Sequence, residues 1–136
     1  MRFFFDNNLS PYLASAIHSL ISPDGHEVVH TRRRFGPDTP DVEWIGQLGD
    51  EGNWIVISGD ADILRKKHEL EVWKRAKLTT FVFAKGFMNR KFWEQTWIVV
   101  RWWPTVMEFA HKVAPGAAFK IPLSYGTGKG GLQQLL

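Results

Sequence analysis

The chain has 136 residues, of which 44% are hydrophobic and 14% aromatic, so one well-filled core is expected and a second independent core is not. It contains no cysteine, which excludes disulfides, thiolate metal sites and a cysteine nucleophile. The net charge of +3 favours a polyanionic partner, although many proteins with this charge bind no nucleic acid. No apolar run approaches the roughly 18 residues of a membrane span, so we expect a cytoplasmic protein with no membrane partner.

Strands and helices are predicted to alternate from the start of the chain. Residues 2–5 form an apolar run that ends at Asp6 and predicts a buried strand. Ser10 and Pro11 are typical of a helix cap and first turn, and the apolar spacing after them predicts a helix to about Leu20.

The middle of the chain continues this alternation. Residues 26–30 predict a second strand, residues 31–38 a basic loop without periodicity, and residues 41–49 a short helix capped at Thr39-Pro40. The clearest strand is WIVIS at residues 54–58, which runs into Gly59-Asp60-Ala61-Asp62. A helix over residues 63–76 and a fourth strand over residues 79–84 follow.

The C-terminal third is predicted to be less regular. Residues 90–113 predict two helices joined at Trp103-Pro104, because proline removes a backbone donor inside a helix. An edge strand is expected at residues 119–122, and the glycines that follow predict a flexible tail. We therefore expect one three-layer α/β domain over residues 1–123, with a mostly parallel sheet of about four strands flanked by helices, and a tail over residues 124–136.

Four aspartates are expected at one edge of this sheet. Asp6, Asp60 and Asp62 follow strands, and the carboxyl ends of parallel strands surround the functional crevice in open α/β sheets. Asp41 begins a helix that faces the same edge. Two carboxylates about 4 Å apart repel by roughly 4 kcal/mol at an effective dielectric near 20, so a cation is expected among them.

Oxygen ligands suit Mg²⁺ or Mn²⁺, and such sites commonly serve the hydrolysis of phosphodiesters. Each aspartate also has a structural interpretation. Asp6 is compatible with a turn residue, Asp41 with compensation of a helix dipole, and Asp62 with a helix N-cap. Their convergence on one edge favours the metal site.

Two long segments, FFFDNNLSPYLASAI and HTRRRFGPDTPDVEWIGQLGDEGNWIVISGDADI, resemble the compact PIN-like nuclease domains, particularly those of VapC-type toxins. The resemblance continues through LTTFVFAKG and RWWPTVMEFA. It implies a Mg²⁺- or Mn²⁺-dependent ribonuclease whose catalytic and metal-binding acids are Asp6, Asp41, Asp60 and Asp62. The resemblance also implies that the chain is the toxin of a type II toxin–antitoxin system. Its candidate partners are an RNA substrate, a protein antitoxin and a second copy of the chain in a homodimer.

Secondary candidates surround these acids. The family often has a glutamate at the position of Asn7, so a metal contact there would be neutral. Glu43 either replaces Asp41 or shares its role. Glu69 or Glu71 is a candidate for an acid outside the direct ligands of the metal. The alternative is that these glutamates are ordinary exposed charges on a helix.

Basic and aromatic residues also have two interpretations. Arg32, Arg33 and Arg34 are candidates to contact RNA phosphates, or they form a solvated basic loop. The tryptophans of residues 93–103 are expected in a core or dimer interface rather than stacked on bases.

Two other functions are open at this point. Aspartyl-phosphate phosphatases also use a strand-end aspartate, but they need a second aspartate two positions later, where this chain has Asn8. The alternative from a different class is a PIN-like RNA-binding or scaffold protein whose acidic site is not catalytic.

Overall fold

The computed structural model describes residues 1–126 and 131–136. Its centre is one sheet in the order β2-β1-β3-β4-β5-β6, in which β1 to β5 are parallel and β6 runs antiparallel to β5. The strands are β1 (Arg2–Phe5), β2 (Glu27–His30), β3 (Trp54–Ser58), β4 (Thr79–Phe83), β5 (Ala118–Ile121) and β6 (Gln133–Gln134).

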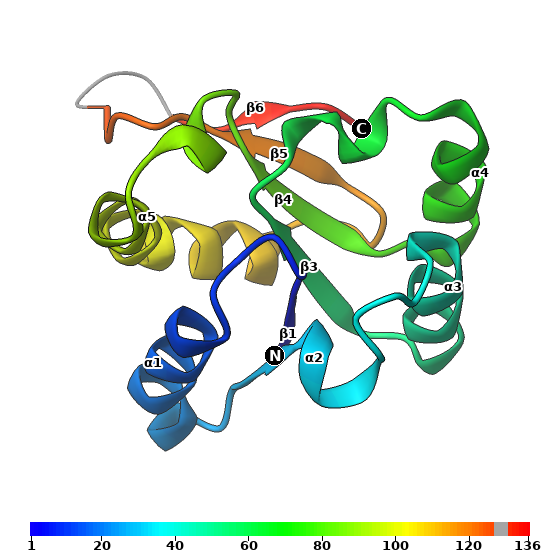
Figure 1. Cartoon of the computed structure of the whole chain (residues 1–136), viewed down its shortest axis with the longest axis horizontal. Coiled ribbons are helices and arrows are strands. Elements are labelled where there is room, and N and C mark those ends of the chain that lie inside the picture. Colours follow the sequence, from blue (N-terminus) through cyan, green and yellow to red (C-terminus); the bar gives the residue numbers. More distant parts are fainter. Residues whose placement is uncertain (127–130) are drawn as a thin grey trace.

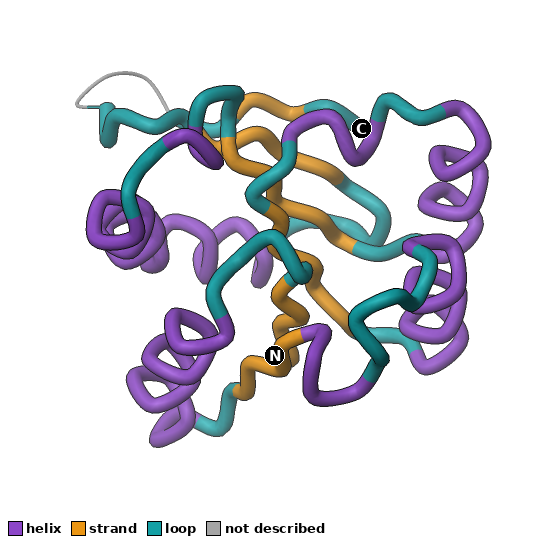
Figure 2. Tube along the Cα trace, in the orientation of Figure 1, coloured by secondary structure: helices purple, strands orange, loops and turns teal. Residues whose placement is uncertain are grey.

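Helices cover both faces of the sheet, so the predicted α/β fold with three layers is confirmed (Figure 1). The α-helices are α1 (Pro11–Ile21), α2 (Thr31–Arg34), α3 (Asp41–Glu51), α4 (Lys67–Ala76) and α5 (Phe92–Lys112). The 3-10 turns are η1 (Ser22–Asp24), η2 (Ala61–Leu64) and η3 (Phe87–Asn89). α1 and α5 lie on one face, and α3 and α4 lie on the other, with the strands between the two helical layers (Figures 1 and 2). In the described part of the chain, no helix combines the length and the apolar character needed to cross a bilayer.

The first strand explains why both faces need a helical cover. Phe3 and Phe5 belong to the core under α1 and α5, whereas Phe4 belongs to the core under α3 and α4. The ring of Phe3 lies 4.9 Å from that of Trp103, and the ring of Phe4 lies 5.2 Å from that of Trp44. Because consecutive side chains of a strand point to opposite faces, an uninterrupted apolar run indicates a strand buried on both sides.

The sheet has six strands, so the prediction of about four is wrong. Part of the predicted flexible tail is also wrong, because Gln133 and Gln134 form β6 and pair with Lys120 and Phe119. Gly131 packs so closely on Trp102 that an added Cβ would lie 2.6 Å from the indole. The remaining part of the tail prediction, at residues 127–130, lies outside the described residues.

α5 is one continuous helix, so the prediction of two helices joined at Trp103-Pro104 is wrong. Pro104 is exposed, while its neighbours Trp102 and Trp103 are buried in the core. The hydrophobic packing of these neighbours holds the helix together across the missing backbone donor. Trp93 and Trp97 are 78% and 63% exposed, so the expected core position applies to Trp102 and Trp103 and not to them.

Three local predictions also need correction. Residues 31–34 form the short helix α2 instead of a loop, because the side chain of His30 accepts the N–H of Arg32 and caps the helix. The helix expected over residues 63–76 is divided into η2 and α4. Pro40, and not Thr39, is the N-cap of α3.

The substitution Pro104→Ala tests the continuity of α5. Alanine would supply the missing N–H at an exposed position, so we expect the free energy of unfolding to rise by about 1–3 kcal/mol. Urea denaturation of both proteins measures the change. An unchanged or lower stability would contradict a continuous helix at this position.

Candidate functional site

The order of the strands places a crevice at the carboxyl ends of β1 and β3. The chain leaves β1 to form β2 on one side and then returns to form β3 on the other, and ligands of open α/β sheets bind at such a switch point. Asp6 is the first residue after β1, and its N–H donates to the carbonyl of Ile57 at 2.9 Å. Because Phe5 pairs with Ile57, Asp6 lies beside Ser58 at the end of β3.

The carboxylate of Asp6 is buried and hydrogen-bonded, with 6% of the residue exposed. Its Oδ1 accepts the N–H of Asn7 at 2.6 Å, and its Oδ2 accepts the hydroxyl of Ser58 at 3.0 Å and the amide of Asn8 at 3.3 Å. Burial raises the pKa of Asp6 to about 6, and the charges of Asp41 and Asp60 raise it as well. The hydrogen bonds from Asn7 and Ser58 act in the opposite direction, because they stabilise the ionised carboxylate.

Ser58 and Asn8 connect the loops that follow β1 and β3, a role that the sequence analysis missed. The amide nitrogen of Asn8 also donates to Ser58 Oγ at 3.2 Å, while its Oδ1 accepts the N–H of Gly59 at 2.9 Å. Ser58 Oγ in turn accepts the N–H of Asp60 at 3.2 Å. The only sequence signal for this network is a serine at the end of an otherwise apolar strand.

Asp41 and Asp60 reach the same crevice from two other elements. Asp41 begins α3, where its Oδ1 accepts the indole N–H of the buried Trp44 at 3.0 Å. Asp60 caps η2, because its Oδ1 accepts the N–H of Asp62 at 2.9 Å. Each carboxylate is therefore held by a hydrogen bond, and the charges of both raise the pKa of Asp6.

Gly59 lets the loop after β3 approach η3. A Cβ at this position would lie 2.7 Å from Met88 Sδ and 3.1 Å from the ring of Phe87. A larger residue would therefore require the Met88 side chain to move and would crowd the ring of Phe87.

The family model of the PIN like domain matches residues 1–85, a range that contains β1 to β4 and all the predicted aspartates. The chain belongs to the PIN-like domain family. PIN domains are in general metal-dependent nucleases, so this chain has a nuclease-type fold. No curated protein and no solved structure matches the chain.

The PIN-like domain holds its other candidate acids differently. The carboxylate of Asp62 is 64% exposed and lies 3.4 Å from the guanidinium of Arg65. Glu43 is exposed on the first turn of α3, and the buried Glu69 on α4 lies 3.9 Å from Lys66. Glu71 is also exposed on α4, and none of these acids contributes to the raised pKa of Asp6. A metal-binding role for them stays a prediction.

Of the three arginines, one contacts Asn7, the residue that follows Asp6. Arg32 donates from Nε to the side-chain oxygen of Asn7 at 3.1 Å. Arg33 donates to Ser15 Oγ on α1. Arg34 forms two hydrogen bonds with Glu51, at 2.9 and 2.6 Å, at the opposite end of α3 from Asp41. Arg32 is therefore better placed than the other two to contact a phosphate at this site.

His30 is a further structural residue that the sequence did not indicate. Its Nδ1 accepts the N–H of Arg32 at 3.1 Å, so its Nε2 donates to the carbonyl of Leu9 at 2.6 Å. Burial lowers the pKa of His30, which favours this neutral form. His30 thus joins the loop that follows Asp6 to the start of α2.

The acids of this PIN-like domain fit a hard divalent cation in their chemistry. Among the acidic and histidine side chains that the structure describes, no three are already arranged to hold an ion. Mg²⁺, however, is commonly held by one or two carboxylates, with water and substrate phosphates completing its octahedron. The repulsion of Asp6 by Asp41 and Asp60 is the electrostatic condition that a cation relieves.

The raised pKa of Asp6 predicts a specific dependence of stability on pH. The Asp6 carboxyl binds its proton more tightly in the folded state (pKa about 6) than in the unfolded state (3.8), so protonation stabilises the fold. This stabilisation is complete below pH 3.8 and is lost as the pH rises through 6. Over this range the free energy of unfolding should fall by about 3 kcal/mol, and Asp6→Asn should abolish this pH dependence. Urea denaturation in EDTA between pH 4 and 7 measures this difference, with the exposed Asp24→Asn as a control. Equal pH dependence in wild type and Asp6→Asn would contradict the assignment.

Proposed function

We propose that this chain is a Mg²⁺- or Mn²⁺-dependent endoribonuclease that hydrolyses RNA phosphodiesters, and that it is the cytoplasmic toxin of a type II toxin–antitoxin system. The observation that supports the nuclease most directly is the buried Asp6 at the switch point of the sheet, whose pKa is raised by burial and by the charges of Asp41 and Asp60. Membership of a family of metal-dependent nucleases supports the same chemistry.

In this proposal Asp6, Asp41 and Asp60 hold the cation, and Asp62 is the fourth acid of the site. When bound, the cation supplies Lewis-acid activation of water and of the phosphodiester. Because the pKa of Asp6 is about 6, its carboxylate is mostly ionised at neutral pH and is available as a ligand. Acidification below pH 6 protonates it.

The surrounding residues position these carboxylates. Ser58 and Asn8 hold Asp6 Oδ2 by hydrogen bonds, and Trp44 holds Asp41 Oδ1. Fixed ligands need little rearrangement when substrate binds, which favours catalysis. Arg32, next to Asn7, is the arginine proposed to contact the substrate phosphate.

The toxin assignment rests on the resemblance of the sequence to VapC-type domains. We propose that an antitoxin covers the acidic crevice and blocks access of the substrate to it. A homodimer is proposed as the assembly, with the exposed Trp93 and Trp97 of α5 as candidate contacts.

One observation favours a second candidate, an RNA-binding or scaffold protein with a non-catalytic acidic site. No group of three potential metal ligands is pre-arranged in the described part of the chain. Such a protein would bind RNA without cleaving it. A cleavage assay separates the two functions.

The assay uses a radiolabelled structured RNA with Mg²⁺ or Mn²⁺. We expect Asp6→Asn and Asp60→Asn to lower the cleavage rate by about a hundredfold or more, since losing a ligand should cost at least as much as losing a residue that orients one. EDTA should abolish cleavage by the wild type. Asp24→Asn, an exposed acid in η1, is the matched control and should cleave normally.

Circular dichroism establishes that each variant is folded. Full cleavage by both Asp6→Asn and Asp60→Asn, or cleavage that persists in EDTA, would rule out the proposed nuclease. RNA binding by a wild type that cleaves nothing would favour the scaffold.

A further inference from the structure

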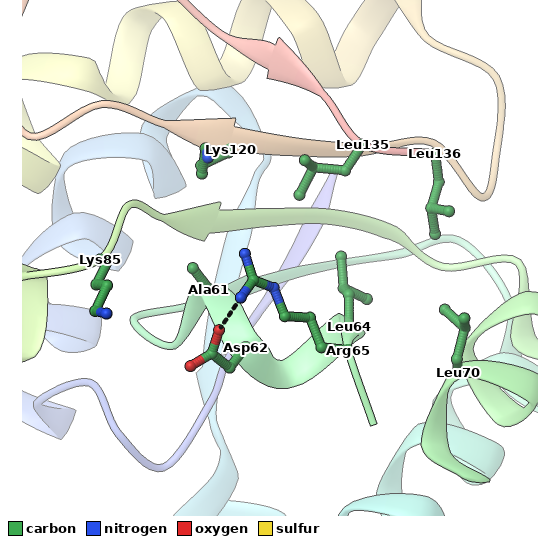
Figure 3. A pocket seen from close by; sticks show the side chains of 9 residues that line it. All are labelled: Ala61, Asp62, Leu64, Arg65, Leu70, Lys85, Lys120, Leu135 and Leu136. Carbon is green, nitrogen blue, oxygen red and sulfur yellow. Dashed lines mark ion pairs between the residues drawn. The ribbon is translucent and has the colours of Figure 1, made fainter. Parts of the chain in front are cut away.

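A hollow of about 250 Å³ lies beside the loop that carries Asp62, on the α4 side of the sheet (Figure 3). It is bordered by η2, the start of α4, the segment after β4, and the strands β5 and β6 with the residues that follow. Its lining residues are Ala61, Asp62, Leu64, Arg65, Leu70, Lys85, Lys120, Leu135 and Leu136. The side chains thus come from segments far apart in the sequence.

The charged lining of this hollow is mainly positive. The charged side chains that line it are Arg65, Lys85 and Lys120, with one acidic side chain, Asp62, beside Arg65. Neither lysine has an ion-pair partner among the residues that the structure describes. The pair between Asp62 and Arg65 has side chains 64% and 80% exposed, so it is weak and leaves the guanidinium available.

Lys120 occupies an unusual position for a lysine. It lies in β5, which is paired on both sides by β4 and β6 and is not an edge strand. Two residues earlier on the same face, Ala118 is buried in the core under α3 and α4. Lys120 lines the hollow, and a lysine in such a place can lay its aliphatic stem along apolar neighbours while its ammonium group stays in contact with water. The packing of the sheet alone does not require a charge there.

The hollow is continuous with the acidic site. A second hollow, of about 180 Å³, is lined by Gly59, Asp60, Ala61, Asp62, Lys85, Gly86, Met88 and Asn89. The two share Ala61, Asp62 and Lys85, so one surface leads from Asp60 to Lys120. A chain held at Asp60 can therefore extend along Lys85 to Lys120.

We propose that this hollow binds a backbone phosphate of single-stranded RNA, next to the phosphodiester held at the acidic site. Lys120 and Arg65 contact this phosphate, Lys85 contacts the RNA backbone on the side toward Asp60, and the leucines of the hollow contact the adjoining sugar and base (Figure 3). The proposal rests on the proposed function in one respect, namely that RNA is the substrate of the neighbouring acids. Its test measures binding alone, so that its failure can be distinguished from failure of the nuclease.

The experiment measures fluorescence anisotropy of a fluorescein-labelled 12-nucleotide oligouridine in EDTA, where no metal-dependent cleavage occurs. The variant Lys85→Gln/Lys120→Gln removes two charges and keeps side chains of similar length. The control Lys74→Gln/Lys112→Gln removes the same charge from the last turns of α4 and α5, at the opposite end of the sheet. The variant Lys85→Arg/Lys120→Arg keeps both charges. It reports whether a protein substituted at these two positions still folds and binds RNA.

We expect the Lys85/Lys120 glutamine variant to bind about fivefold more weakly for each lost phosphate contact at 0.1 M salt, with a salt slope smaller by about 0.7 per contact. The arginine variant and the distant control should bind within about twofold of the wild type. Wild-type affinity in the glutamine variant, or equal losses in the control, would overturn the proposal. Selective loss would support the site even if the wild type cleaved no RNA, a result that would reject the nuclease alone.

Discussion

The burial of the Asp6 carboxylate at the junction of β1 and β3 is the constraint on which the site depends. Transfer of a charge from water into a protein is costly unless other groups stabilise it. Asn7, Ser58 and Asn8 donate three hydrogen bonds, yet the pKa remains raised to about 6, because burial dominates and Asp41 and Asp60 add repulsion. The fold therefore maintains an electrostatic strain that a bound cation would relieve, and this strain connects the architecture to metal-dependent chemistry.

The two aromatic cores keep this carboxylate in place. Phe3 and Phe5 pack under α1 and α5, while Phe4 packs under α3 and α4, so β1 cannot shift toward either face without losing contacts. Trp44 serves both packing and the site, because its ring contacts Phe4 while its N–H binds Asp41. A rigid frame of this kind keeps acids that repel one another close together.

Much of the frame could be predicted from the sequence because it depends on local patterns. Apolar runs that end at Asp6 and Ser58 indicate parallel strands, and their carboxyl ends must meet at one edge. The surroundings of Asp62 are different, because its exposed carboxylate lies 3.4 Å from Arg65 in the turn η2. The sequence spacing from Asp60 alone does not indicate this ion pair.

Other features depended on tertiary contacts that no local pattern encodes. Burial of Trp102 and Trp103 keeps α5 intact at Pro104 against the local preference of proline. The pairing of β6 with β5 depends on an open strand edge and not on the composition of the tail. The connection of Ser58, Asn8 and Asp6 likewise becomes visible only when β1 and β3 lie side by side.

The most direct test of the central claim is isothermal titration calorimetry of Mn²⁺ binding to the wild type and to Asp6→Asn at pH 7. The account predicts saturable binding to the wild type, and at least about tenfold weaker binding to the variant, because one charged ligand is lost from an oxygen site. Equal Mn²⁺ affinity in the two proteins, or no binding to the wild type, would contradict the claim that Asp6 and its neighbouring aspartates form a metal site.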